Sequence, residues 1–186
     1  MVTPDPESDP ESEPVPGPDQ RLERARSAVA TVCDPELPPL TLVDLGIVRS
    51  VSVEDGTVVV TVTPTYSGCP ALEHIEDEIR RTLTAAGLEP VRVDRSYAPA
   101  WTTDWVTERG RRKLADAGIS PPRPTAAVAG PSVGMPVALG RRAPSPPCPH
   151  CGHTATEELS RFSSTACKAL HRCTSCSEPF DHFKEI

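Results

Sequence analysis

The sequence is short of aromatic residues and has no long apolar run. Phe, Trp and Tyr together account for seven of its 186 residues, whereas proline accounts for 23. No stretch approaches the roughly 18 consecutive apolar residues that cross a bilayer. The first residues also lack the basic and apolar regions of a secretory signal. We therefore expect a cytoplasmic protein without membrane contact, in which the proline-rich segments lie outside the packed core.

An excess of basic residues is also missing. The formal net charge at pH 7 is −7, and residues 1–20 contribute six acids and no base. The rest of the chain then holds 20 acids against 19 bases. Binding to a nucleic acid backbone needs clustered Lys and Arg, and residues 148–186 hold no surplus of them. The composition therefore argues against a nucleic acid partner.

Composition divides the chain into four segments. Residues 1–20 alternate Pro with Asp, Glu and Ser, and we expect them to form a disordered acidic tail. Residues 21–119 have the periodicity of an α/β domain. Residues 120–147 contain eight prolines, and we expect a linker that lets the last segment move relative to the domain. Residues 148–186 hold five of the seven cysteines and form the last segment.

The α/β domain begins with a helix and a hairpin. Apolar residues recur at helical spacing over residues 21–33, and Pro35 ends that pattern. Residues 47–53 and 58–62 alternate apolar with polar side chains, as half-buried strands do. The sequence Glu-Asp-Gly at 54–56 has the composition of a hairpin turn. These two strands are therefore predicted to be antiparallel.

A second helix and a third strand complete the predicted sheet. Residues 72–83 have helical periodicity, and Val91 and Val93 indicate a strand after them. Because strand–helix–strand crossovers are right-handed, the third strand is expected to lie parallel to its neighbour. A last helix is expected to be capped by Thr103 or Asp104 and to end near Ala117. The fold class is a mixed three-stranded sheet with helices.

The last segment has the cysteine spacing of a zinc ribbon. Cys148 and Cys151 form one Cys-x-x-Cys pair, and Cys173 and Cys176 form a second pair after 21 intervening residues. Two such pairs supply the four thiolates of a tetrahedral, structural Zn²⁺ site. Two disulfides are the alternative, but a reducing cytoplasm does not favour them. The packing of this small module is expected to come from a few apolar residues, namely Leu159, Phe162, Leu170, Phe180 and Phe183.

Cys69 is the sharpest candidate for chemistry in the α/β domain. It lies in a Gly-Cys-Pro sequence directly before a predicted helix. Unpaired backbone N–H groups and the helix dipole would lower the pKa of a thiol there and yield a reactive thiolate. The alternative is an inert cysteine packed behind a turn.

Asp34 and Glu36 are the second candidate. Two carboxylates on either side of Pro35 could face one point, as metal ligands or as general acid and base. A solvated loop is the alternative interpretation. No Ser/His/Asp arrangement, phosphate-binding loop or dinucleotide fingerprint is present, so the residues alone offer no complete active site.

Several motifs in the chain are similar to those of known families. The sequences Asp-Pro-Glu at 34–36, Leu-Val-Asp-Leu-Gly-Ile-Val at 42–48 and Thr-Pro-Thr-Tyr-Ser-Gly-Cys-Pro at 63–70 resemble the MIP18 (DUF59) family, whose members assist iron–sulfur cluster assembly. Three further motifs narrow the resemblance to PaaD-type subunits of the phenylacetyl-CoA epoxidase system. They are Pro-Ala-Trp-Thr-Thr-Asp-Trp at 99–105, Ser-Thr-Ala-Cys-Lys-Ala-Leu at 164–170 and Glu-Pro-Phe-Asp-His-Phe-Lys at 178–184.

The resemblance implies an accessory subunit in aerobic phenylacetate catabolism and not an enzyme in its own right. Its partners would be a di-iron oxygenase and a flavin and [2Fe–2S] reductase, which it would help to mature. Cys69, with Asp34 and Glu36, would then handle iron or a transient iron–sulfur cluster, and two copies of the chain could share a cluster in a homodimer. Cys167 is either an additional exchangeable thiol or a packed residue of the ribbon.

An electron carrier is the alternative function. Iron bound by the four ribbon thiolates would resemble a rubredoxin, whose cysteine pairs are each followed by glycine. Gly152 fits that pattern after the first pair, but Ser177 follows the second. The sequence therefore favours zinc at this site.

Overall fold

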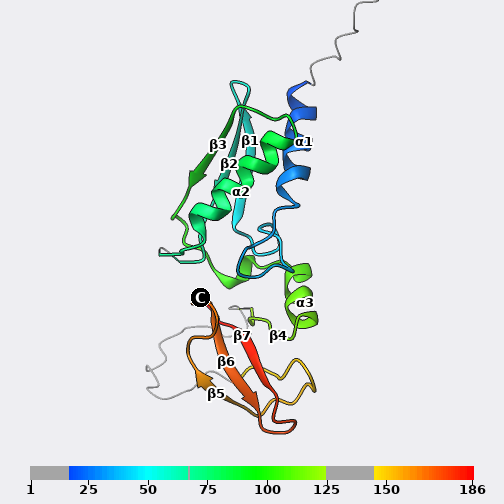
Figure 1. The fold of residues 1–186 in the computed structure, drawn as a ribbon, viewed down its shortest axis with the longest axis vertical. Helices are drawn as coiled ribbons and strands as arrows, with labels where there is room; N and C mark the ends of the chain where they lie inside the picture. Colours follow the sequence, from blue (N-terminus) through cyan, green and yellow to red (C-terminus); the bar gives the residue numbers. More distant parts are fainter. Residues whose placement is uncertain (1–16, 67, 125–144) are drawn as a thin grey trace, which may run out of the picture.

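The computed structural model describes residues 17–66, 68–124 and 145–186. Most of the expected acidic tail, most of the expected linker and Ser67 lie outside these residues. Figure 1 shows two modules stacked along the long axis of the molecule, with α3 and the C-terminus at the level where they meet. None of the helices in the described ranges is both long and apolar enough to cross a membrane.

A mixed three-stranded sheet forms the first module and confirms the predicted fold class. Strands β1 (Val48–Glu54) and β2 (Thr57–Val62) are antiparallel. Asp55 and Gly56 make the turn between them with positive φ angles of 49° and 78°, as a tight hairpin requires. Strand β3 (Val91–Arg95) lies parallel to β2, as the crossover rule predicts.

Two helices cover this sheet. Helix α1 (Pro18–Val29) packs along β1, α2 (Leu72–Ala85) packs along β3, and the helices contact each other. Helix α1 ends four residues earlier than predicted. Its C-terminal residues give way to a loop in which the backbone N–H of Asp34 donates to the carbonyl of Leu40, and that of Leu42 donates to Val32. The residues after Val29 therefore belong to the loop and not to the helix.

The last helix of the first module starts later than predicted. A 3-10 turn, η1 (Thr103–Trp105), precedes α3 (Glu108–Asp116). The side chain of Thr107 caps α3 by accepting from the backbone N–H of Gly110 at 3.0 Å. The prediction that Thr103 or Asp104 caps this helix was wrong, because Val106 has an extended backbone that separates the two elements.

Asp44 fixes α3 to the first module. Its carboxylate is fully buried and binds Arg109 at 2.5 Å and Lys113 at 2.8 Å, both from α3. These charge-assisted bonds hold the pKa of Asp44 far below its ordinary value despite its burial.

The second module is a four-stranded sheet to which the first module contributes one strand. Strands β5 (Thr156–Ser160), β6 (Lys168–Cys173) and β7 (Pro179–Phe183) are antiparallel neighbours. Strand β4 (Ile119–Ser120) directly follows α3 and pairs with β7 in parallel. We call β5–β7 with their connecting loops, residues 145–186, the ribbon. The segment expected to begin a linker at residue 120 therefore starts inside this sheet.

Aromatic packing reinforces the strand pairing between the modules. The rings of Trp101 and Phe183 lie 6.1 Å apart, and both side chains are buried. The backbone N–H of Thr103 donates to the carbonyl of Ile186 at 3.2 Å. A single hydrophobic cluster includes the sheet core, Leu114 of α3 and Phe183 of the ribbon. These contacts dock the ribbon on the first module, and movement of the ribbon relative to that module stays a prediction.

Not all of the expected ribbon core is buried. Phe180 and Phe183 are buried, as expected, and Leu170 is half-buried. Leu159 and Phe162 were expected to pack inside, but they are 48% and 65% exposed. Lys184 covers one face of the Phe162 ring at 4.4 Å from its centroid. These two residues therefore belong to the surface of the ribbon, next to its edge strand β5.

Gly46 lies where the loop before β1 passes close to the 3-10 turn η1, and its substitution tests that packing. Its φ is +69°, and a Cβ there would lie 2.5 Å from the carbonyl oxygen of Trp105. Gly56 also has a positive φ, but its added Cβ would meet nothing within 4 Å. Gly56→Ala should therefore cost only the conformational strain, about 1–2 kcal/mol. Gly46→Ala should cost about 1–3 kcal/mol more because of the clash. Urea unfolding of the full chain measures both, and equal losses would contradict the predicted close packing.

Candidate functional site

The four cysteines of the ribbon form a closed metal site. The sulfurs of Cys148, Cys151, Cys173 and Cys176 all lie within 4.8 Å of one another. The Sγ atoms of Cys148 and Cys176 are 3.8 Å apart, and those of Cys151 and Cys173 are 3.6 Å apart. Zn–S bonds of about 2.3 Å place the sulfurs of a tetrahedral site about 3.8 Å apart. The donor set therefore fits Zn²⁺, and it leaves no coordination position for a substrate.

Two turns of matching conformation hold these thiols. Gly152 follows the first pair with φ +74°, and Ser177 follows the second pair with φ +64°. In each turn the backbone N–H of this residue donates to the carbonyl of the first cysteine of the pair, Cys148 or Cys173. Ser177 thus adopts the conformation that favours glycine. The sequence difference between the pairs therefore does not distinguish a zinc ribbon from a rubredoxin-like iron site.

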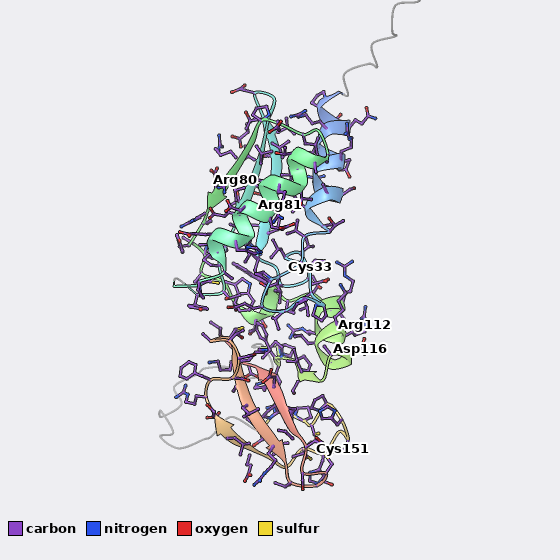
Figure 2. The ribbon with its side chains drawn as sticks, viewed as in Figure 1. Cys33, Arg80, Arg81, Arg112, Asp116 and Cys151 are labelled. Atoms are coloured by element: carbon purple, nitrogen blue, oxygen red, sulfur yellow. The ribbon has the colours of Figure 1, made fainter. Side chains whose placement is uncertain are left out.

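The closed site lies within the ribbon. Figure 2 shows Cys151 in the ribbon, below Asp116 of α3, whereas Cys33 lies in the first module. Cys148 and Cys173 form a small core with Phe180, separate from the main hydrophobic cluster. A metal here would hold the ribbon's turns together, a structural role that small cores need.

Cys69 lies in the loop between β2 and α2. Its side chain is partly buried and packs against the main hydrophobic cluster. Burial raises the pKa of the Cys69 thiol, and the negative charges of Glu36, Asp34 and Cys167 raise it further. The backbone N–H of Ala71 opposes this shift but does not overcome it. The prediction of a lowered pKa at this helix start was therefore wrong, because the thiol is partly buried and the neighbouring carboxylates are negative.

Asp34 and Glu36 belong to the loop after α1 and have different surroundings. Asp34 is buried, and its Oδ1 accepts hydrogen bonds from the backbone N–H groups of Glu36 and Leu37, both at 2.9 Å. Burial raises the pKa of Asp34. Glu36 is half-buried, and its carboxylate accepts no hydrogen bond from the described residues. Asp34 therefore shapes the loop, while the carboxylate of Glu36 is available for a ligand.

Cys167 of the ribbon lies near these groups. It is 5% exposed and belongs to the hydrophobic cluster that contains the core of the first module. Burial raises the pKa of its thiol, and the charges of Glu36 and Asp34 add to that effect. Electrostatic interactions thus link two thiols and two carboxylates of the two modules. Their ligand atoms are not as close together as those of the ribbon site. Among the described residues, the ribbon site is the only group of three or more possible metal ligands whose ligand atoms all lie within 4.8 Å of one another.

Lys168 was missed by the sequence analysis. This buried side chain forms an ion pair with Asp181 at 3.0 Å. Its positive charge also lowers the pKa of Glu36, against the larger effects of burial and of Asp34. The only signal in the sequence was its position next to Cys167. Lys168 therefore supplies positive charge beside a group of acidic side chains.

Comparisons with known proteins cover both modules. Residues 22–94 match a family model described as an iron-sulfur cluster assembly protein, and residues 134–184 match one described as the PaaD zinc beta ribbon domain. The chain is 47% identical over 158 residues to the D subunit of the 1,2-phenylacetyl-CoA epoxidase of Escherichia coli, covering 85% of this chain and 89% of that protein.

Two other similarities each cover about half of this chain. An Fe-S protein maturation auxiliary factor of Porphyromonas gingivalis is 36% identical over 86 residues, which cover 45% of this chain and 81% of that protein. A crystal structure of a DUF59 domain from Bacillus anthracis superposes with a TM-score of 0.48 at 24% identity. It covers 52% of this chain and 92% of that one.

The identity of the ribbon metal can be tested directly. We expect the purified chain to contain one zinc, to be colourless, and to lose the ribbon's folded structure when Cys176→Ser removes a ligand. Cys33→Ser is the matched control, because Cys33 is an exposed cysteine outside the ribbon. Metal analysis and far-UV circular dichroism report both effects. A red protein with one iron in place of zinc would contradict this assignment and favour the electron carrier.

Proposed function

The chain belongs to the family of the phenylacetyl-CoA epoxidase D subunit, with an iron–sulfur assembly domain and a PaaD zinc ribbon, and from this premise we propose that it assists iron loading of the epoxidase. In this proposal it is an accessory subunit that receives iron or a transient iron–sulfur cluster and passes it to another subunit. It turns over no substrate of its own and acts in the cytoplasm.

The position of Cys69 beside two carboxylates carries this proposal. Thiolate and carboxylate groups are both iron ligands. Without a cation, burial and the charges of Glu36 and Asp34 keep the thiol protonated. A bound cation would reverse this effect, because a nearby positive charge favours the thiolate. Such a site suits cargo that binds and leaves, in contrast to the closed ribbon site.

The zinc ribbon suits the role of a docking module in this scheme. Its metal would stabilise the strands, and its surface presents Leu159 and Phe162 beside the edge strand β5. Leu159 and Phe162 would supply the apolar contacts of such a docking surface. We propose that the client is the flavin and [2Fe–2S] reductase or the di-iron oxygenase, since both would need iron.

A rubredoxin-like electron carrier is the second candidate. The left-handed conformation of Ser177 fits it as well as it fits a zinc ribbon, because both cysteine pairs have the turn that such iron sites use. That function would place the redox chemistry in the four ribbon thiolates and leave Cys69 without a role.

Replacement of Cys69 separates the two candidates. We expect reductase and oxygenase produced together with the Cys69→Ala chain to carry as little iron as those produced without this chain. Iron content per client subunit is the measurement, and epoxidase activity should fall in parallel. The Cys33→Ala chain is the matched control and should support full loading. Reductase and oxygenase that carry full iron and have full activity when produced with the Cys69→Ala chain would contradict the proposed function.

A further inference from the structure

We infer that the metal of the ribbon controls the docking of the ribbon on the first module, so that loss of zinc opens the boundary between them while the first module stays folded. The inference rests on the zinc assignment and not on the proposed function. Residues 118–123, which we call the seam, carry the coupling. They contact both the chain around the first cysteine pair and the end of the ribbon that follows β7.

The first cysteine pair lies against the beginning of the seam. His150 stands between the two cysteines of this pair, and a Cβ added at Gly118 would lie only 3.4 Å from Cε1 of the His150 ring. At the other end of the seam, the guanidinium of Arg123 donates to the carbonyl of Ser145, three residues before the pair begins. The first module therefore contacts the chain on both sides of Cys148.

The seam also holds β7 and the residues after it. Ser120 of β4 pairs with His182 of β7 (Figure 1), and its carbonyl lies 3.1 Å from Nδ1 of that histidine. The carboxylate of Glu185 lies 3.2 Å from Nε2 of His182 and accepts from the backbone N–H of Arg123 at 3.2 Å. Burial raises the pKa of Glu185, but the hydrogen bond from His182 opposes it, and the pKa falls to about 2. An ionised carboxylate therefore links β7 to the seam.

Strand β7 belongs to both hydrophobic clusters of the molecule. Phe180 packs with Cys148 and Cys173 in the small core beside the metal site. Phe183 belongs to the main cluster, where its ring lies 6.1 Å from that of Trp101. Successive side chains of a strand point to opposite faces, so residues three apart can serve two clusters. Displacement of β7 would therefore disturb the metal core and the boundary together.

The metal joins the two parts of the ribbon that these contacts hold. The first cysteine pair lies at the seam, and the second pair lies in the connection from β6 to β7. Small cores of this kind need a metal to fold. Coupling between two events is reciprocal, so a metal that favours the docked state is bound more tightly in that state. Contacts across the seam should therefore strengthen zinc binding.

Trp101 can report the opening of the boundary. It is 4% exposed, and the chain has two tryptophans, so Trp105→Phe leaves it as the only one. We expect a chelator to expose Trp101 to quenching by acrylamide at the same midpoint as zinc release, and added zinc to reverse the change. The helical signal in circular dichroism should remain, because all the helices of the described residues belong to the first module.

Glu185→Gln tests the coupling from the opposite direction. It removes the charge that links β7 to the seam and leaves all four zinc ligands in place. We expect it to weaken zinc binding about fivefold or more, within the common range of coupling between sites. Glu157→Gln is the matched control, because Glu157 forms an exposed ion pair with Arg172 inside the ribbon. Competition with a chromophoric zinc chelator measures both affinities in the full chain.

Three results would overturn the inference. Trp101 that stays shielded from acrylamide after zinc has left would show that docking does not depend on the metal. Loss of the helical signal together with zinc would show that the whole chain unfolds. Equal zinc affinities of Glu185→Gln and Glu157→Gln would show that no coupling crosses the seam. Each of these results leaves iron loading through Cys69 untouched, so the proposed function stands or fails separately.

Discussion

The docking of the ribbon on the first module is the constraint on which the rest of the structure depends. Strand β4 leaves α3 and pairs with β7, and the rings of Trp101 and Phe183 close the boundary at 6.1 Å between centroids. Asp44 holds α3 in place through Arg109 and Lys113. Charge-assisted bonds thus hold α3 to the rest of the first module, and buried apolar contacts join the ribbon to that module. The Cys167 thiol of the ribbon then interacts electrostatically with Glu36 and Asp34.

The proposed function assigns two kinds of metal chemistry to one chain. The ribbon site has four thiols at tetrahedral spacing, and nothing in it is left open for exchange. The group at the boundary is looser and mixes sulfur with oxygen. Its thiols are kept protonated by burial and by neighbouring negative charge. The first site suits a resident structural ion, and the second suits iron in transit.

Local patterns in the sequence predicted the local structure well. The turn at Asp55 and Gly56, the parallel placement of β3 and the four ribbon cysteines followed from backbone rules and ligand spacing. Features that depend on distant residues could not be predicted in this way. The pKa of Cys69 is raised first by its burial and then by the negative charges of Glu36 and Asp34, which are far away in sequence. The docking of the ribbon depends on distant residues in the same way, since β4 and Trp101 have their partners in it.

X-ray absorption on the full chain, holding zinc and loaded anaerobically with ferrous iron, tests the division between the two sites most directly. At the zinc edge we predict four sulfur ligands. At the iron edge of the same sample we predict a sulfur ligand from Cys69 together with oxygen donors. Iron surrounded by four sulfurs would place it in the ribbon, and iron with no sulfur ligand would leave Cys69 outside the site. Either result would contradict the proposed division between the two sites.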